Sequence, residues 1–150
     1  MKLRFLAIAA LALTSTFALA QSKPEDMIRI REGGMGILSR NVSALNAMAK
    51  GDVPYNKEVA VQKAEFVNVL AAEIFASGFG AGSDKGWQTR AKPAVWAEAD
   101  NFKTAQDKLL GALKKVQASA GDQAALKTAM GDVGGTCKGC HDNFRDSSYH

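Results

Sequence analysis

The stretch DQAALKTAMGDVGGTCKGCHDNFR, residues 122–145, decides the fold of this chain of 150 residues. Its apolar and thiol side chains recur at steps of four, three, four, three and four, at Leu126, Met130, Val133, Cys137, Cys140 and Phe144. Steps of three and four place side chains on one face of an α-helix, so the spacing predicts a helix with one buried face. Gly121 and Asp122 come directly before it and are expected to cap it.

The end of this predicted helix carries a motif with a chemistry of its own, Cys137-Lys138-Gly139-Cys140-His141. Two thiols three positions apart can each add to a vinyl group of one haem, and the histidine that follows can bind the iron. The motif therefore indicates one covalently attached haem c, with both sulfurs on the buried face.

A redox dithiol, a zinc site and a structural disulfide are the alternatives for the same residues. Redox Cys-x-x-Cys motifs usually lie beside a βαβ unit, and no strand alternates with a helix in this sequence. A zinc site would need His150 beside Cys137, Cys140 and His141, because the chain has no other Cys or His. A disulfide between the two cysteines would close a very short loop and stabilise little. Haem attachment is favoured, and the dithiol and zinc alternatives stay open.

The start of the chain has the pattern of an export signal. A short basic region precedes an apolar run at residues 5–13, and Ala-Leu-Ala at residues 18–20 matches a signal-peptidase site. We expect residues 1–20 to be a cleaved signal peptide and residues 21–150 to form one domain in the periplasm, an oxidising compartment. The apolar run is too short to span a bilayer and no second one follows, so no membrane span is expected in the mature chain.

The charge of the chain does not indicate a nucleic-acid partner. The formal net charge is +4, and removal of Lys2 and Arg4 with the signal peptide lowers it to +2. The remaining basic residues are interleaved with Asp and Glu, which is typical of solvated helix faces.

Three further stretches have helical apolar spacing, at about residues 24–50, 57–76 and 93–119, with punctuated loops between them. Ser22 is a candidate cap for the first. The expected buried positions of the first are Met27, Ile30, Gly34 or Met35, Leu38, Val42, Leu45 and Met48 or Ala49. Those of the second are Val59, Phe66, Val67, Leu70, Ile74 and Phe75. Those of the third are Trp96, Ala99, Phe102, Ala105, Leu109, Leu113 and Val116. We expect an all-α, antiparallel four-helix bundle with the covalently bound haem c inside it.

With these features the chain resembles the class II cytochromes c, the cytochrome c′ family with its low-spin His/Met subgroup. The resemblance rests on the attachment site in the last helix and on four segments: Ala-Lys-Gly at 49–51, Pro-Tyr at 54–55, Pro-Ala-Val-Trp at 93–96 and CKGCHDNFR at 137–145. It covers essentially the whole mature chain.

The resemblance implies roles around the motif. Cys137 and Cys140 would form the thioether bonds, and His141 would be the proximal iron ligand. Arg145 stands where the family often has a basic residue. One turn beyond His141 on the same face, it would contact a haem propionate, line the proximal pocket or remain a solvated side chain.

Two residues of the first helix are implied at the haem propionates. Arg31 matches a position that contacts a propionate in the family. Glu32 stands where many members have glutamine, and a carboxylate beside a propionate would repel it, so the role of Glu32 is left open.

Met35 is the residue on which the coordination of the iron depends. In the family this position faces the open side of the haem, and in the low-spin subgroup a methionine there binds the iron; filling of the core is the alternative. Gly33, Gly34 and Gly36 surround it, although glycine in a helix costs roughly 0.5–1 kcal/mol relative to alanine. We expect these glycines to let the helix approach a haem face.

Two functions follow. With His141 and Met35 both bound to iron, the protein would carry single electrons between redox partner proteins. With the iron five-coordinate, it would bind NO or CO, as a gas-binding or NO-protective protein. No enzyme activity is expected, because the chain offers no distal histidine and no nucleophile with a base beside it. Many relatives pair through their first two helices, so a homodimer is among the expected states.

Overall fold

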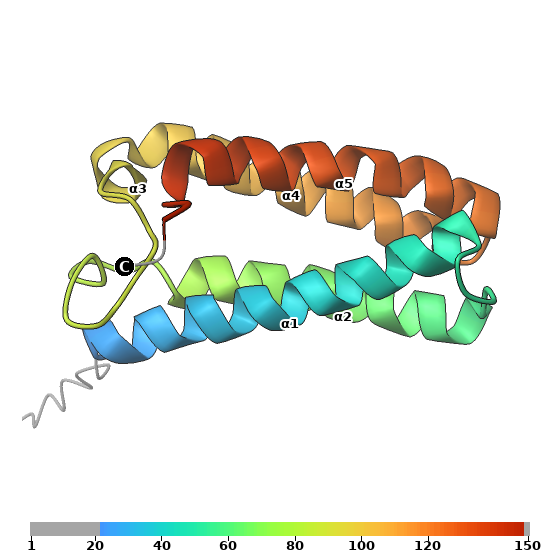
Figure 1. The fold of residues 1–150 in the computed structure, drawn as a ribbon, viewed down its shortest axis with the longest axis horizontal. Helices are drawn as coiled ribbons and strands as arrows, with labels where there is room; N and C mark the ends of the chain where they lie inside the picture. Colours follow the sequence, from blue (N-terminus) through green and yellow to red (C-terminus); the bar gives the residue numbers. More distant parts are fainter. Residues whose placement is uncertain (1–21, 149–150) are drawn as a thin grey trace, which may run out of the picture.

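The computed structural model describes residues 22–148, and this part of the chain is helical, without strands. Its elements are α1 (Pro24–Lys50), α2 (Lys57–Ser77), α3 (Ala94–Ala97), α4 (Ala99–Ser119) and α5 (Gln123–Phe144). The four long helices run antiparallel to their neighbours in the chain and form a bundle (Figure 1). The expected all-α four-helix bundle is confirmed.

The signal segment expected at residues 1–20 lies outside the described residues. Within residues 22–148, none of the helices is both long enough and apolar enough to cross a membrane.

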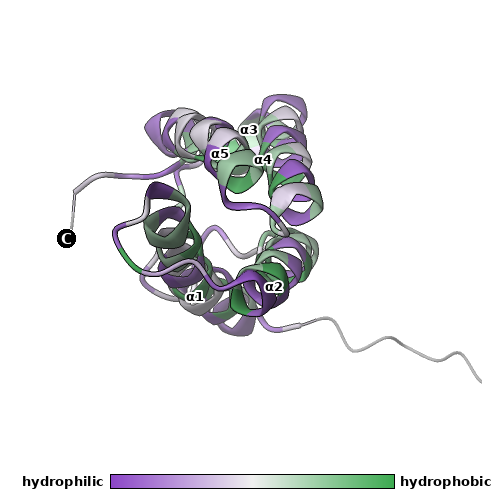
Figure 2. Cartoon of the chain, turned by 90° about the vertical axis from the view of Figure 1, so that its right-hand side faces the viewer, coloured by the Kyte–Doolittle hydropathy of each residue, from purple (hydrophilic) through white to green (hydrophobic). Residues whose placement is uncertain are grey.

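The bundle consists of two helix pairs with a shared apolar centre. α1 packs mainly against α2, and α4 packs mainly against α5. The end-on view shows these two pairs, with much of the hydrophobic surface of each helix turned toward the middle (Figure 2). All four long helices contribute fully buried side chains, among them Leu45, Val67, Leu113, Leu126 and Val133. Each such side chain stabilises the fold by roughly 1.5–3 kcal/mol through burial.

The helix ends follow local chemistry, with one difference from expectation. Asn56 and Asp122 cap α2 and α5, because their side-chain oxygens accept the backbone N–H groups of Val59 and Ala125 at 2.9 and 2.8 Å. Ser22 is not the cap of α1: that position is held by Lys23, which makes no side-chain capping bond. The helix begins instead on Pro24, whose fixed φ suits the first turn.

The third predicted helix is interrupted. Glu98 has φ −119° and ψ 50°, which separates the single turn of α3 from α4. The break lets Val95 of α3 pack with Phe102 and Phe144 in a second apolar cluster at one end of the bundle. Trp96 holds α3 to the preceding loop, since its Nε1–H donates to the carbonyl oxygen of Phe79 at 3.2 Å.

The predicted buried face of α2 is confirmed in part. Val67 and Ile74 are buried, and Leu70 and Phe75 are half-buried. Val59 and Phe66 are instead 38% and 47% exposed, and the small side chains of Ala60, Ala64 and Ala71 are buried with the predicted residues. Small side chains let α2 lie close to its neighbours. On other helices Ile30 and Ala99 are also exposed, contrary to prediction.

The glycines of α1 do not face one surface. A Cβ atom on Gly34 would lie 2.6 Å from Cγ1 of Ile74, so this glycine permits the close contact between α1 and α2. Gly33 and Gly36 have no such neighbour, and both are exposed. The expectation that all three lie over a haem face is therefore wrong for Gly34, whose contact is with another helix.

Candidate haem site

The last turns of α5 present the two thiols of the motif to the interior. Cys137 is half-buried against the main core, and Cys140 is half-buried against the second cluster that contains Phe102 and Phe144. No disulfide joins them. The predicted stripe on the last helix is confirmed, since its four apolar members are buried and its two cysteines are half-buried.

The surroundings of the thiols argue against a redox dithiol. Burial raises the pKa of Cys137, and burial together with the neighbouring Cys137 raises the pKa of Cys140. Reactive dithiols have a thiol whose pKa is lowered by a helix N-terminus or a cationic neighbour. Here the thiols lie near the C-terminal end of a helix and stay protonated.

His141 follows on the same turn. Although the residue is exposed as a whole, partial burial of its ring lowers its pKa, the positive charges of Arg145 and Arg90 lower it further, and Asp142 opposes them. A lowered pKa keeps the imidazole neutral near pH 7, which is the form that binds a metal.

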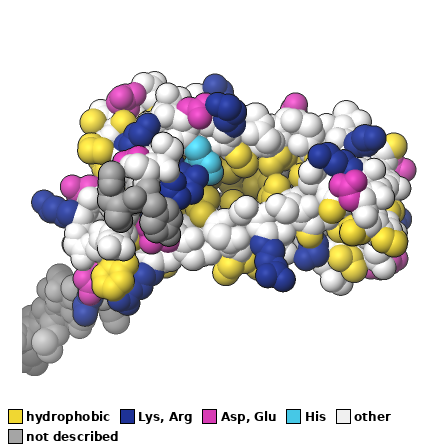
Figure 3. All heavy atoms as spheres, viewed as in Figure 1, with side chains coloured by type: hydrophobic (Ala, Val, Ile, Leu, Met, Phe, Trp, Pro, Cys, Tyr) yellow, Lys and Arg dark blue, Asp and Glu magenta, His cyan; other side chains and the backbone are white. Residues whose placement is uncertain are grey.

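An apolar hollow lies beside this part of α5. The space-filling view shows hydrophobic side chains lining a depression between α5 and α1, with a histidine side chain at its edge (Figure 3). Gly134, Cys137 and His141 lie at steps of three and four along α5 and so share one face. A Cβ atom on Gly134 would meet no atom within 4 Å, so no other side chain covers α5 at this position. Two thiols, an imidazole and an apolar hollow are the donor set and surroundings that a covalent haem needs.

A groove with a volume of about 870 Å³ lies along α4 and α5. Cys140 and Phe144 line it, together with charged side chains such as Lys108, Lys115 and Asp132. Cys137 and His141 do not line it. The groove therefore contacts only one of the three residues of the motif.

Met35 lies on α1, half-buried and packed against the main core. Leu38 and Val42 follow it on the inner side of the helix. This placement is compatible with either expected role, as an iron ligand or as part of the core.

Arg31 is buried, with 3% of its surface exposed. Its Nη1 donates to the carbonyl oxygen of Gly78 at 2.9 Å and to Ser83 Oγ at 3.0 Å. Its Nη2 donates to the carbonyl oxygen of Ser83 at 2.7 Å and to Thr89 Oγ1 at 2.5 Å. Arg31 thus ties α1 to the loop that follows α2, a role that the sequence did not reveal.

The electrostatics of Arg31 are those of a buried cation with neutral partners. Burial lowers its pKa, and the charges of Glu32 and Asp84 act in the opposite direction. Its four bonding partners are uncharged oxygens, and both carboxylates are exposed. A buried positive charge of this kind favours an anionic group nearby, such as a propionate.

Arg145 is placed differently from the prediction. It lies beyond the end of α5 with an extended backbone (φ −122°, ψ 131°) and forms an isolated antiparallel bridge with Ala91, so it does not continue the helix face of His141. Its charge still acts on His141. The helix ends here because the chain after Phe144 pairs with residues 90–92, a tertiary contact invisible in the local pattern.

The zinc alternative gains no support. Among residues 22–148, no three His, Cys, Asp or Glu side chains are grouped so that they could hold a metal ion. His150, the fourth ligand considered, lies outside the described part of the chain.

Comparison with known proteins identifies the family. The profile of the family described as Cytochrome C′ matches residues 26–145. The cytochrome c′ of Rubrivivax gelatinosus is 40% identical over 126 residues, which cover 83% of this chain and 97% of that protein. Its crystal structure superposes with a TM-score of 0.79 over 83% of this chain and 98% of that one.

Two further relatives bear on function. The nitric oxide complex of a variant of cytochrome c prime from Alcaligenes xylosoxidans has a TM-score of 0.77 at 32% identity, covering 84% of this chain and 98% of that one. A carbon monoxide complex of another variant of that protein matches equally well. Cytochrome c-554 of Cereibacter sphaeroides is 38% identical over 149 residues, which cover 92% of this chain and 96% of that protein. The chain belongs to the cytochrome c′ family and carries covalent haem c.

Proposed function

We propose that this cytochrome c′ binds NO or CO at a haem joined to Cys137 and Cys140, with His141 as its iron ligand. The observation that carries the proposal is the half-buried pair of thiols and the neutral histidine on one face of α5 beside an apolar hollow. The NO and CO complexes of relatives support gas binding. No enzyme activity is part of this function.

The haem would supply an iron that exchanges one electron and binds a diatomic gas. The chain's own residues contribute the rest. The thioether bonds of Cys137 and Cys140 would hold the ring, and the neutral imidazole of His141 would bind iron without first losing a proton. The apolar hollow would hold the ring, and Arg31 and Arg145 would provide positive charge for the propionates. The carboxylate of Glu32 would repel a propionate, so Glu32 has no part in this proposal.

We also propose that the protein works in the periplasm, with residues 1–20 removed as a signal peptide and residues 21–150 as the mature domain. The support is the sequence pattern of the leader and the oxidising compartment that haem attachment requires. Determination of the N-terminal residue of the exported protein tests this: Gln21 is expected, and retained Met1 on a haem-loaded chain would contradict it.

Absorption spectroscopy tests gas binding. The reduced haem protein should change its spectrum on addition of CO, because an open position on the iron takes the gas. A reduced spectrum that changes with neither CO nor NO would refute the proposal. Haem attachment is tested separately by the double variant Cys137→Ala with Cys140→Ala, which should lose its haem to acidified organic solvent. The control is Thr128→Ala, an exposed position on the same helix; equal haem retention in both variants would contradict the attachment.

Electron carriage with Met35 as a second iron ligand is the other candidate. Two observations favour it: Met35 lies on the inner side of α1, and a relative is a cytochrome c-554. If Met35 binds the iron, the native protein ignores CO and Met35→Leu takes it up. Met48→Leu, a buried methionine of the same helix, is the control. CO uptake by the native protein would refute Met35 ligation.

We propose, finally, that two copies pair through the outer side of α1 and α2. Four apolar side chains are exposed there, Ile30, Ile37, Val59 and Phe66, with exposed fractions of 38% to 50%. The hydrogen bond from Lys63 Nζ to Asn41 Oδ1 joins the two helices. Ile37, Val59 and Phe66 lie about one turn from this bond along their helices, and Ile30 lies about three turns from it. Such a patch favours association with a like surface. Sedimentation should show a dimer that Phe66→Lys converts to a monomer; a native monomer would contradict this.

A further inference from the structure

The segment after α5 is fastened to a loop far away in the chain. The N–H of Asp146 donates to the carbonyl oxygen of Arg90 at 2.7 Å, and the N–H of Lys92 donates to that of Phe144 at 2.9 Å. Between them, Ala91 and Arg145 form the antiparallel bridge. We call residues 90–92 with residues 144–147 the C-terminal clasp.

Side chains of the loop reinforce this clasp. Arg90 Nε donates to the carbonyl oxygen of Asp146 at 2.9 Å, and Arg90 Nη2 donates to that of Ser147 at 3.1 Å. Lys92 Nζ donates to the carbonyl oxygen of Asp142 at 2.9 Å, in the last turn of α5. A cation that binds the free carbonyl groups at a helix C-terminus stabilises that end.

The clasp closes immediately beyond His141. The N–H of Arg145 donates to the carbonyl oxygen of His141 at 3.1 Å, so the histidine belongs to the turn that the clasp terminates. The charged groups that act on the imidazole are Arg145 and Arg90, with Asp142 opposing them. Asp142 is itself ion-paired with Lys138 on the same helix. The guanidinium of Arg90 is fixed by two hydrogen bonds to the segment that directly follows α5, so its charge holds a constant position beside the end of the helix that carries His141.

We propose that Arg90 is a positioning residue for the haem iron, holding the end of α5 in place and presenting a fixed positive charge to His141. The proposal rests on the proposed role of His141 as the iron ligand. Groups that surround a metal ligand tune the metal through orientation and charge. Reduction of the iron adds one negative charge, so a cation near its ligand stabilises the reduced state and raises the reduction potential.

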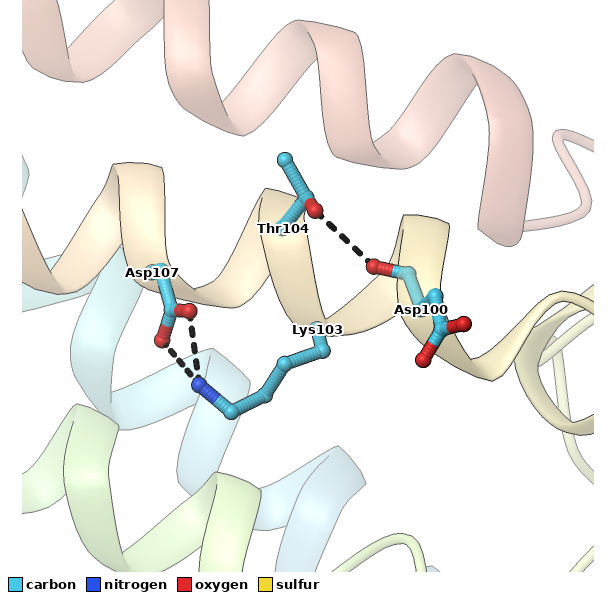
Figure 4. A network of polar contacts seen from close by, with 4 residues as sticks. All are labelled: Asp100, Lys103, Thr104 and Asp107. Atoms are coloured by element: carbon cyan, nitrogen blue, oxygen red, sulfur yellow. Dashed lines mark hydrogen bonds and ion pairs between the residues drawn. The ribbon is translucent and has the colours of Figure 1, made fainter.

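The reduction potential of the haem-loaded protein tests the charge. Arg90→Gln removes the positive charge and should lower the midpoint potential, whereas Arg90→Lys keeps the charge and should lower it less. Lys103→Gln is the matched control, because it also removes one positive charge. Lys103 pairs with Asp107 on an exposed part of α4, with Nζ 2.5 Å from Oδ1, and is absent from the charges that act on His141 (Figure 4).

Amide hydrogen exchange tests the fastening. Both Arg90 variants should speed the exchange of the Arg145 and Asp146 amides, because both lose the pair of hydrogen bonds that the guanidinium donates to the clasp. The control Lys103→Gln should leave this exchange unchanged. A midpoint potential unchanged in Arg90→Gln, or lowered equally by Lys103→Gln, would overturn the proposal while leaving haem binding intact. A native protein that holds no covalent haem would instead refute the proposed function, so the two failures are distinguishable.

Discussion

The two ends of the bundle are built differently. At the end where α5 begins, the helices close on fully buried aliphatic side chains such as Leu45, Leu113 and Leu126. At the end where α5 finishes, the interior holds a buried arginine, two half-buried thiols and a long loop. The first end is complete as a protein core, whereas the second is organised around positions for another group. The comparison teaches that one helix pattern can serve packing at one end and cofactor attachment at the other.

The largest loss of stability is expected at the end of the bundle where α5 begins. Leu113→Ala removes a fully buried side chain and should lower the free energy of unfolding of the haem protein by about 2–5 kcal/mol. Leu110→Ala, at a half-buried neighbouring position, is the control and should cost less. Urea denaturation measures both. Equal losses would show that this end is not the packed core described here.

At the end of the bundle where α5 finishes, Arg31→Met should lower the free energy of unfolding. The cause is the loss of hydrogen bonds to buried polar groups and not a loss of packing. The carbonyl oxygens of Gly78 and Ser83 would lose their donor, which costs roughly 1–3 kcal/mol for a buried group. Arg29→Met, at an exposed position two residues earlier, is the control. Urea denaturation measures both variants. If Arg31→Met lowers the free energy of unfolding no more than Arg29→Met does, the loop does not depend on Arg31.

Alanine substitutions at two of the glycines near Met35 should change the stability in opposite directions. Gly34→Ala forces its Cβ against Ile74 and should cost about 1–3 kcal/mol, as overpacking does. Gly36→Ala meets open space and should stabilise by roughly 0.5–1 kcal/mol through helix propensity. Thermal unfolding of the haem protein measures both. If both substitutions stabilise, the close contact between α1 and α2 is absent.

The smallest loss of stability is expected at Tyr55, at the end of the bundle where α5 begins. Its hydroxyl donates to the carbonyl oxygen of Ala120 at 2.7 Å, and Tyr55→Phe should cost about 0.5–1.5 kcal/mol. Burial, with Asp122 and Glu58, raises the pKa of Tyr55, so the folded state favours the protonated phenol. This contribution is present below the ordinary tyrosine pKa of about 10 and is lost as pH rises through the folded value. The difference between native and variant stability should shrink in alkali; a constant difference would contradict it.

Local patterns predicted most of the fold. The range 24–50 predicted for the first helix agrees with α1, because proline, two acidic residues and a terminal glycine mark its ends. The buried face of α5 could be predicted equally well, because its apolar and thiol side chains recur at steps of three and four. Only the neighbouring helices decide which apolar residues of α2 are buried. The interruption at Glu98 likewise depends on a cluster that joins three distant segments.

In the candidate site, too, local spacing predicted some of the residues and distant contacts determine the others. Cys137, Cys140 and His141 are adjacent in sequence and could be named from their spacing. Arg31 and Arg90 act through partners 47 to 58 residues away, so no local pattern could indicate their bonds. The extended backbone of Arg145 has the same origin, because the strand-like pairing with Ala91 overrides the helical period.

The protonated, half-buried state of the two thiols bears on the order of assembly. When α5 is docked before haem attachment, Cys137 and Cys140 are half-buried and burial raises the pKa of both thiols, which makes them less reactive than on an open chain. They also belong to the last helix, so they are synthesised after α1, α2 and α4. Attachment is therefore easiest on a chain whose last helix has not yet docked. Docking of α5 and closure of the C-terminal clasp then become the final steps, which seal a haem already bound.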